Sequence, residues 1–192
     1  TRPTKARLLT LADQERTLEN QHALSLAVQH RKAGDLPKAK SIYKQILQAD
    51  PNQPVVLHFL GLIARQVGES DRAVKLIGDA LKIKPDYAEA HSNLGSVFQE
   101  LGEVDEAMAS YSRAITIKPD YAEAHYNLGN ALQELGQLEE ALSSYSKALN
   151  VRPDYVEVHN NLGLTLQALG ELDKAVTSYN KAISIDPALV EA

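Results

Sequence analysis

The strongest constraint on the fold is a strict internal period of 34 residues. Prolines recur at this spacing, at Pro51, Pro85, Pro119, Pro153 and Pro187. The segments 85–118 and 119–152 are identical at 20 of their 34 positions, and segment 153–186 repeats the pattern. Periods of this length are typical of repeat proteins, in which each unit packs mainly on its neighbours. The sequence therefore predicts a stack of repeats rather than one globular core.

Within one period the apolar residues predict two helices. In the first helix they follow a helical spacing, at Ala124, Leu128, Ala131, Leu132 and Leu135. Gly136 then ends this helix, because glycine adopts positive φ without steric cost. A second amphipathic run follows over residues 138–151, and Pro153 ends it because proline lacks the amide hydrogen that a helix needs.

Two further recurring features concern how the helices begin and how they pack. Aspartate and glutamate stand three residues apart before the first helix, which predicts an acidic capping box at Asp86/Glu89, Asp120/Glu123 and Asp154/Glu157. Small residues recur where two helices of a hairpin must approach closely. They are Gly61, Gly95, Gly129 and Gly163 on the first helix, and Ala73, Ala107, Ala141 and Ala175 on the second.

The order of these residues resembles the tetratricopeptide repeat. Leu128-Gly129, Leu132, Ala141, Tyr145 and Pro153 carry the resemblance, and their counterparts stand one period earlier and one period later. The resemblance covers about residues 20–192, and the later repeats are similar to the repeat domain of O-linked N-acetylglucosamine transferases and to bacterial tetratricopeptide-repeat proteins. It implies an all-α fold, a right-handed superhelix or α-solenoid of about five helix-turn-helix repeats.

The period divides the chain into segments. We place the five repeats at residues 17–50, 51–84, 85–118, 119–152 and 153–186. Residues 1–16 are expected to form an N-terminal arm or capping helix, and residues 187–192 to begin a truncated sixth repeat. The first two repeats are irregular, whereas the last three are close to the family pattern.

Composition and charge limit the compartment and the partners. The chain has no cysteine, no apolar run long enough for a transmembrane helix and no signal core, so we expect a cytoplasmic protein without a membrane partner. Residues 1–84 carry 14 Lys+Arg and 8 Asp+Glu, whereas residues 85–192 carry 6 and 17. The basic residues Arg2, Lys5 and Arg7 are too few to indicate nucleic-acid binding.

The resemblance also implies a binding surface, because in this family the first helices of successive repeats line a concave groove that takes extended peptides. Side-chain amides recur there in two rows, which we call the amide column: Asn93, Asn127 and Asn161, and Gln99, Gln133 and Gln167. Tyr126, Asn130 and Asn160 stand beside it, and Ser92 holds the position that Tyr126 holds one repeat later. An amide both donates and accepts hydrogen bonds, so the column can hold the main chain of an extended segment. It is similar to the asparagine ladder of O-linked N-acetylglucosamine transferases, which helps to select protein substrates.

Three functions remain open for this surface. The chain is a protein–protein interaction module, the substrate-recruitment domain of a larger, glycosyltransferase-like enzyme, or a scaffold that self-associates through exposed terminal helices. Alternatively, the asparagines are solvated residues that were duplicated with the repeat. Since no basic cluster faces the groove in the last three repeats, we expect a neutral or basic segment as partner rather than an acidic one.

No constellation in the sequence indicates catalysis. His91, His125 and His159 recur on successive helices, which lie about 8–10 Å apart, too far for zinc ligands. We interpret them as packing residues, and likewise Tyr111, Tyr145 and Tyr179 on the second helices. The sequence predicts neither an enzyme nor a cofactor or metal site.

Overall fold

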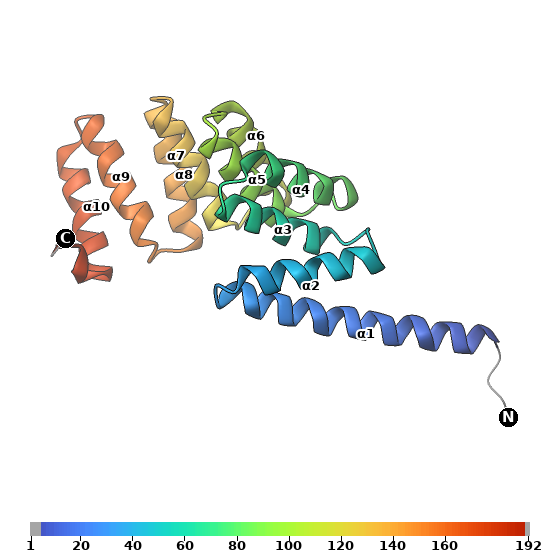
Figure 1. Ribbon diagram of the computed structural model, residues 1–192. Helices are drawn as coiled ribbons and strands as arrows, with labels where there is room; N and C mark the ends of the chain where they lie inside the picture. The colour runs from blue at the N-terminus through green and yellow to red at the C-terminus, as the bar shows by residue number, and fades with distance from the viewer. Residues whose placement is uncertain (1–4, 191–192) are drawn as a thin grey trace. The chain divides into compact units, whose positions relative to one another are not determined.

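The computed structural model describes the backbone of residues 5–190 and the side chains of residues 19–188. Over this range the chain forms ten α-helices, one 3-10 helix, η1 (Pro187–Val190), and no strand (Figure 1). The prediction of an all-α solenoid of about five helix-turn-helix repeats is confirmed. The α-helices are α1 (Lys5–Lys32), α2 (Leu36–Ala49), α3 (Pro54–Gln66), α4 (Ser70–Ile83), α5 (Ala88–Glu100), α6 (Val104–Ile117), α7 (Ala122–Glu134), α8 (Leu138–Val151), α9 (Val156–Ala168) and α10 (Leu172–Ile185).

The chain divides into two compact units. Unit 1 is Thr1–Pro85 and contains the hairpins α1/α2 and α3/α4, with α2 packed against α3. Unit 2 is Asp86–Ala192 and contains the hairpins α5/α6, α7/α8 and α9/α10. The division coincides with the change in charge, since unit 1 is net positive and unit 2 net negative.

Helix α1 runs through the expected boundary between an arm and the first repeat. It begins at Lys5 and continues without a break to Lys32. Residues 1–4 of the expected arm, and residues 191–192 at the other end, lie outside the described range.

Glycine ends the first helix of every hairpin, as the sequence predicts. Gly34, Gly68, Gly102, Gly136 and Gly170 all have positive φ, between 74° and 80°. At Gly136 the backbone closes the helix in the usual glycine-capped manner. The Gly136 amide donates to the Gln133 carbonyl at 3.0 Å, and the next amide, of Gln137, donates to the Leu132 carbonyl at 2.9 Å.

The predicted acidic capping boxes are wrong. The residues at the helix starts are Tyr87, Tyr121 and Tyr155, and none of these three helices has a side-chain cap. The Pro-Asp pair instead forms a turn, in which the Tyr121 amide donates to the Lys118 carbonyl at 3.2 Å. This turn places the aspartate one residue before the cap position.

Two of the glutamates of the expected boxes form ion pairs within their own repeats. Glu123 pairs with Arg152, whose guanidinium carbon lies 4.1 Å from the centre of the Tyr155 ring. One repeat earlier, Glu89 lies 3.9 Å from Lys118, and that ammonium group lies 4.9 Å from the Tyr121 ring. Both ion pairs join the first helix of a hairpin to the turn that follows the second helix of the same hairpin.

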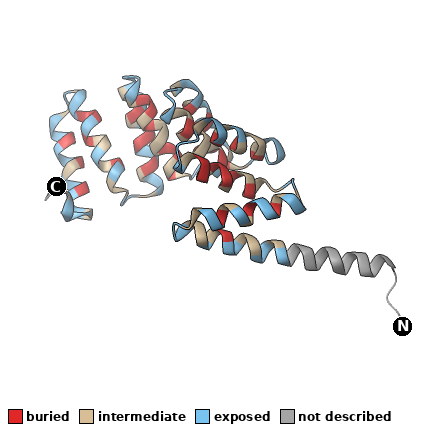
Figure 2. Ribbon diagram, viewed as in Figure 1, coloured by how far each residue is buried: buried red, intermediate tan, exposed pale blue. Residues whose placement is uncertain are grey.

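Close contact between a glycine and an aromatic ring forms the core of each hairpin in unit 2. A Cβ atom on Gly129 would lie 2.5 Å from Cε1 of Tyr145, and one on Gly95 would lie 2.7 Å from Cε1 of Tyr111. Both tyrosines are buried, and buried residues recur along every helix from α2 to α10 (Figure 2). The predicted role of these glycines in helix packing is confirmed.

The first helices of unit 2 also contact one another. Helix α5 packs on α7 and α7 on α9, in addition to the packing of each second helix on the following hairpin. Within the described part of unit 2, the second helices α6, α8 and α10 do not approach each other to the same extent. None of the described helices is long and apolar enough to cross a membrane.

Candidate protein-interaction surface

All six residues of the amide column lie on α5, α7 and α9 of unit 2. Five of them are half-buried, and Gln167 is exposed. Beside the column, Tyr126 and Asn130 on α7 are half-buried, and Asn160 on α9 is exposed. Ser92 differs from the expectation for a groove residue, because it is only 3% exposed.

A tyrosine of the second helix holds each glutamine of the column. The hydroxyl groups of Tyr111, Tyr145 and Tyr179 donate to the Oε1 atoms of Gln99, Gln133 and Gln167, at 3.0, 2.7 and 3.1 Å. The same contact thus recurs in three successive hairpins. Because the carbonyl oxygen is fixed toward the hairpin core, the amide group of each glutamine has a defined orientation.

A second set of bonds joins the first helices of the fourth and fifth repeats. Asn161 Nδ2 donates to Asn130 Oδ1 at 2.8 Å and to the Tyr126 hydroxyl at 3.3 Å. The Tyr145 hydroxyl, whose single hydrogen goes to Gln133, also lies 2.8 Å from Asn130 Oδ1. Asn161 and Asn130 therefore belong to one hydrogen-bonded layer with Tyr126 and are not independent solvated groups.

The third repeat is joined to the fourth by Gln99. Its Nε2 donates to the Glu134 carboxylate at 3.2 Å, and its Oε1 accepts from Tyr111. Both ends of this amide are thus occupied within the protein.

Several polar atoms of the layer remain available to a ligand. Among the described residues, Gln133 Nε2, Gln167 Nε2 and Asn130 Nδ2 have no hydrogen-bond partner, although the oxygens of the same amides accept hydrogen bonds. Asn127 has no hydrogen-bond partner within the described range at either amide atom. Asn161 is the reverse case, because its nitrogen donates while its Oδ1 has no partner in the described range, so the surface leaves both donors and acceptors to a ligand.

Burial keeps the central tyrosine protonated. Burial, and secondarily the neighbouring Tyr126, raises the pKa of Tyr145. The ring centres of these two tyrosines lie 6.2 Å apart, and the Tyr126 and Tyr155 centres lie 5.2 Å apart. Tyr145 therefore remains a hydrogen-bond donor across the physiological pH range.

Unit 1 lacks this arrangement and provides an internal comparison. Arg31 and Arg65 occupy the glutamine position of the period. Tyr43, the counterpart of Tyr111, is fully buried, and its hydroxyl has no hydrogen-bond partner in the described structure. The tyrosine–glutamine pair is thus a property of unit 2.

Sequence reasoning missed the role of these tyrosines in orienting the column. The predicted packing role is correct for their rings but leaves out their hydroxyl groups. The signal was present in the period, because glutamine precedes tyrosine by 12 residues in each of the last three repeats.

The recurring histidines tie the turn between repeats to the following helix. Nε2 of His125 lies 2.9 Å from the Pro119 carbonyl oxygen, and Nε2 of His159 lies 2.8 Å from that of Pro153. Among the described side chains, no group of three or more histidine, aspartate or glutamate residues could share a metal ion.

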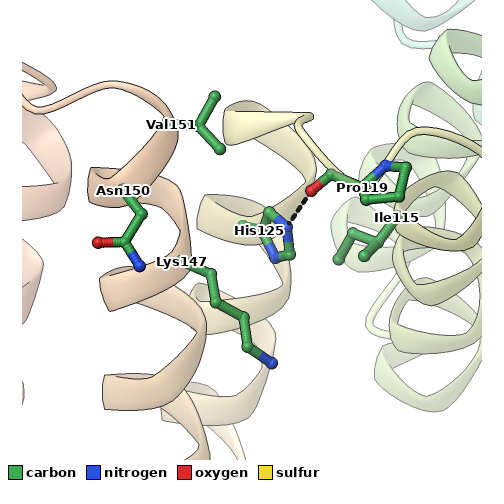
Figure 3. A pocket seen from close by; sticks show the side chains of 6 residues that line it. All are labelled: Ile115, Pro119, His125, Lys147, Asn150 and Val151. Atoms are coloured by element: carbon green, nitrogen blue, oxygen red, sulfur yellow. Dashed lines mark hydrogen bonds between the residues drawn. The ribbon is translucent and has the colours of Figure 1, made fainter.

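His125 also forms part of an open pocket of about 370 Å³ between α6, α7 and α8 (Figure 3). The lining residues are Ile115, Pro119, His125, Lys147, Asn150 and Val151. None of them belongs to the amide column or to its predicted neighbours. The pocket is therefore separate from the candidate surface.

Three family models match the sequence. Two are described as tetratricopeptide repeat, at residues 30–95 and 120–188, and one as TPR repeat, at residues 95–136. Together they extend over residues 30–188, and all three describe repeats rather than an enzyme. No curated protein matches the sequence significantly.

Several solved structures share the fold. MamA is 28% identical with a TM-score of 0.76, over 86% of this chain and 97% of that one. YrrB, described as a TPR protein with an unusual peptide-binding site, is 23% identical with a TM-score of 0.70, over 93% and 92%. PilF of Pseudomonas aeruginosa is 19% identical with a TM-score of 0.84, over 88% and 78%. The last two are similar in fold alone.

Proposed function

The chain belongs to the tetratricopeptide repeat family and is a protein-interaction module, and we propose that unit 2 binds an extended protein segment along the amide column. The observation that carries this proposal is the repeated tyrosine–glutamine bond in three successive hairpins. A solvated surface amide needs no such partner. A ligand-binding amide benefits from one, because an oriented group loses less conformational entropy on binding.

The packing of the first helices supports a continuous surface. Because α5, α7 and α9 approach one another more closely than the second helices do, unit 2 bends toward its first helices. The amides of Gln99, Gln133 and Gln167 then follow one another along the inner side of the bend. An extended segment laid across these helices meets one oriented amide in each repeat.

The charge of unit 2 favours a neutral or basic segment. Unit 2 has 6 Lys+Arg against 17 Asp+Glu. On its first helices Glu157 is exposed, and Glu134 lies beside the column, where it accepts from Gln99. An acidic segment would meet uncompensated like charge at this surface, which costs affinity.

The test is a peptide array probed with the whole chain and two variants. Asn127→Ala/Gln133→Ala removes two amides of the column, and Asn150→Ala removes an exposed amide from the second helix α8 as a matched control. We expect the double variant to lose most bound spots while Asn150→Ala keeps them, with both variants folded by circular dichroism. Binding that survives in the folded double variant would refute the proposal.

A second candidate function, self-association, rests on an apolar row on α10. Leu172, Val176 and Ile183 share one face and are 61%, 57% and 37% exposed. If this row mediates association, sedimentation of the chain will depend on concentration and Val176→Lys will abolish that dependence. A monomer at all concentrations would exclude it. Recruitment of substrates to a linked enzyme would use the amide column itself and stays a prediction.

A further inference from the structure

We infer that the pocket between α6, α7 and α8 binds an acidic protein segment, with one aliphatic side chain of the segment in the pocket and a neighbouring carboxylate beside Lys147. The pocket shares no residue with the amide column, so this inference is independent of the proposed function. It follows from the lining of the pocket and from the arrangement of the cations in unit 2.

The walls of the pocket are largely apolar. Ile115 of α6 and Val151 of α8 lie on opposite sides of it, and Pro119 belongs to the turn between α6 and α7 (Figure 3). Val151 is exposed and Ile115 is half-buried. The volume of about 370 Å³ is at the lower end of the range for ligand pockets, so the pocket suits a side chain rather than a large ligand. An aliphatic side chain bound there is removed from water, which favours binding.

A hydrogen bond fixes the base of the pocket. His125 is buried, and its Nε2 lies 2.9 Å from the Pro119 carbonyl oxygen. Because a carbonyl oxygen only accepts hydrogen bonds, Nε2 carries the hydrogen and donates it. The imidazole ring and the turn hold each other in place, so a ligand loses little free energy to ordering this part of the pocket.

Lys147 lies on the same side of α8 as the apolar wall. It precedes Asn150 and Val151 by three and four residues, a spacing that brings side chains together on one face of a helix. Lys147 is the only lysine or arginine among the six lining residues, and none of the six is acidic. The acidic residues of α8 are Glu139 and Glu140, both in its first turn. The helix therefore supplies no carboxylate to compete for the ammonium group near the pocket.

The cations of unit 2 form two sets. Three of its six lysines and arginines pair with glutamates: Lys118, Arg152 and Lys174. The other three form no ion pair with any described residue, although the unit has 17 Asp+Glu: Arg113, Lys147 and Lys181. These three are 34 residues apart and lie on the second helices α6, α8 and α10. The second helices thus carry a recurring basic position that the acidic residues of the same unit leave unpaired.

This arrangement favours an internal acidic segment over a chain end. A C-terminal carboxylate supplies one negative charge, whereas an acidic segment offers further carboxylates for the equivalent cations, Arg113 and Lys181. Asp120 follows Pro119 in the turn, but it forms no ion pair with Lys147 in the described structure. A ligand carboxylate therefore meets an unpaired ammonium group, which attracts an acidic segment and repels a basic one.

The probe is the acetylated and amidated peptide Gly-Ser-Leu-Glu-Gly-Ser-Leu-Glu-Gly-Ser, titrated into the whole chain. Binding is followed through the side-chain NH₂ signal of Asn150, because Asn150 lines the pocket. One counterpart has alanine in place of both leucines, and another has glutamine in place of both glutamates. We expect the alanine peptide to bind about tenfold more weakly, because it buries less apolar surface, and the glutamine peptide about fivefold more weakly, because it lacks the charge.

Two charge reversals locate the site. Lys147→Glu places a carboxylate at the pocket and should weaken binding of the probe about tenfold. Lys174→Glu makes the same change at an exposed position of α10 outside the pocket and should leave binding unchanged. Both side chains are exposed, and circular dichroism checks that both variants fold. Asn127→Ala/Gln133→Ala should bind the probe as the unaltered chain does, because the amide column is not involved.

Several results would overturn the inference without affecting the proposed function. Equal loss of binding in Lys147→Glu and Lys174→Glu would show that general charge explains the effect. Undiminished binding of the glutamine peptide, or an Asn150 signal that does not respond to the probe, would show that the pocket takes no acidic segment. An Asn150 signal that shifts with protein concentration alone would identify a second copy of the chain as the occupant. Loss of probe binding in Asn127→Ala/Gln133→Ala would place the probe on the amide column instead.

Discussion

Removing the hydroxyl group from each of two equivalent tyrosines should have different effects on stability. Tyr145 and Tyr43 occupy the same position of the period, and both are fully buried. The Tyr145 hydroxyl lies 2.7 Å from Gln133 Oε1 and 2.8 Å from Asn130 Oδ1. The Tyr43 hydroxyl has no hydrogen-bond partner among the described residues.

The expected magnitudes follow from the number of bonds lost. A hydroxyl group has one hydrogen, so Tyr145→Phe removes one net hydrogen bond, worth about 1 kcal/mol, and leaves Gln133 Oε1 without a donor, whereas Asn130 Oδ1 keeps Asn161 as its donor. We therefore expect Tyr145→Phe to lower the free energy of unfolding of unit 2 by about 1–2 kcal/mol. Tyr43→Phe removes a buried polar atom without a partner, and we expect the stability of unit 1 to stay equal or to rise by up to about 1 kcal/mol.

The assay must resolve the two units, because repeat proteins need not unfold in a single step. Urea unfolding followed by circular dichroism gives the overall change, and native-state hydrogen exchange of α1–α4 and α5–α10 assigns it to a unit. Unchanged stability of unit 2 in Tyr145→Phe would show that the hydroxyl contact with Gln133 contributes nothing, and would refute the oriented-amide interpretation.

Three further predictions concern the packing, the titration and the ion pairs of the chain. Gly129→Ala should destabilise unit 2 by about 1–3 kcal/mol, because its Cβ would lie 2.5 Å from the Tyr145 ring. Gly78→Ala, with no atom within 4 Å of the new Cβ, should stabilise α4 by about 0.5–1 kcal/mol, and a urea midpoint that falls in both variants would contradict the packing argument. The free energy of unfolding should fall as the pH rises above about 10, because burial raises the pKa of Tyr145 in the folded state and the unfolded chain then releases its proton first. Tyr145→Phe should reduce this slope in alkaline unfolding curves, and an unchanged slope would argue against it. Arg152→Ala should lower stability by less than about 1 kcal/mol, since the pair with Glu123 is partly exposed, and the effect should shrink in 1 M salt; an effect independent of salt would indicate packing rather than charge.

The fold could be predicted from the sequence because it depends on residues that repeat. The 34-residue period, the helix-ending glycines and the small residues opposite Tyr111 and Tyr145 each specify local geometry through steric properties of the residue itself. Repetition then makes each local inference hold for several hairpins at once.

The capping prediction failed because the spacing of Asp120 and Glu123 does not reveal the turn and the ion pair that compete with a capping box. Asp120 and Glu123 have the spacing of a capping box, but the Pro-Asp turn delays the helix by one residue. Arg152, 29 residues later in the chain, then pairs with Glu123. A pattern of four residues cannot reveal Arg152 as a partner of Glu123, because Arg152 follows the second helix of the hairpin and approaches Glu123 only when the two helices pack.

The location of the amide column could be predicted, but not the state of its atoms. The sequence places Asn161 and Gln133 on first helices, where they are found. That Asn161 donates to Asn130, and that Gln133 accepts from Tyr145, depends on how neighbouring repeats pack. The structure was therefore needed to show which amide atoms already have a partner within the protein.

The most direct test of binding at the column observes the amide hydrogens themselves. In a two-dimensional ¹H–¹⁵N spectrum each asparagine and glutamine side chain gives its own pair of NH₂ signals, which can be assigned by substitution and followed during titration with a peptide from the array. If the segment binds along the column, the NH₂ signals of Gln133, Gln167 and Asn130 will shift while that of Asn150 on α8 stays in place. Shifts at Asn150, with the signals of the column unchanged, would place the ligand elsewhere and contradict the proposed function.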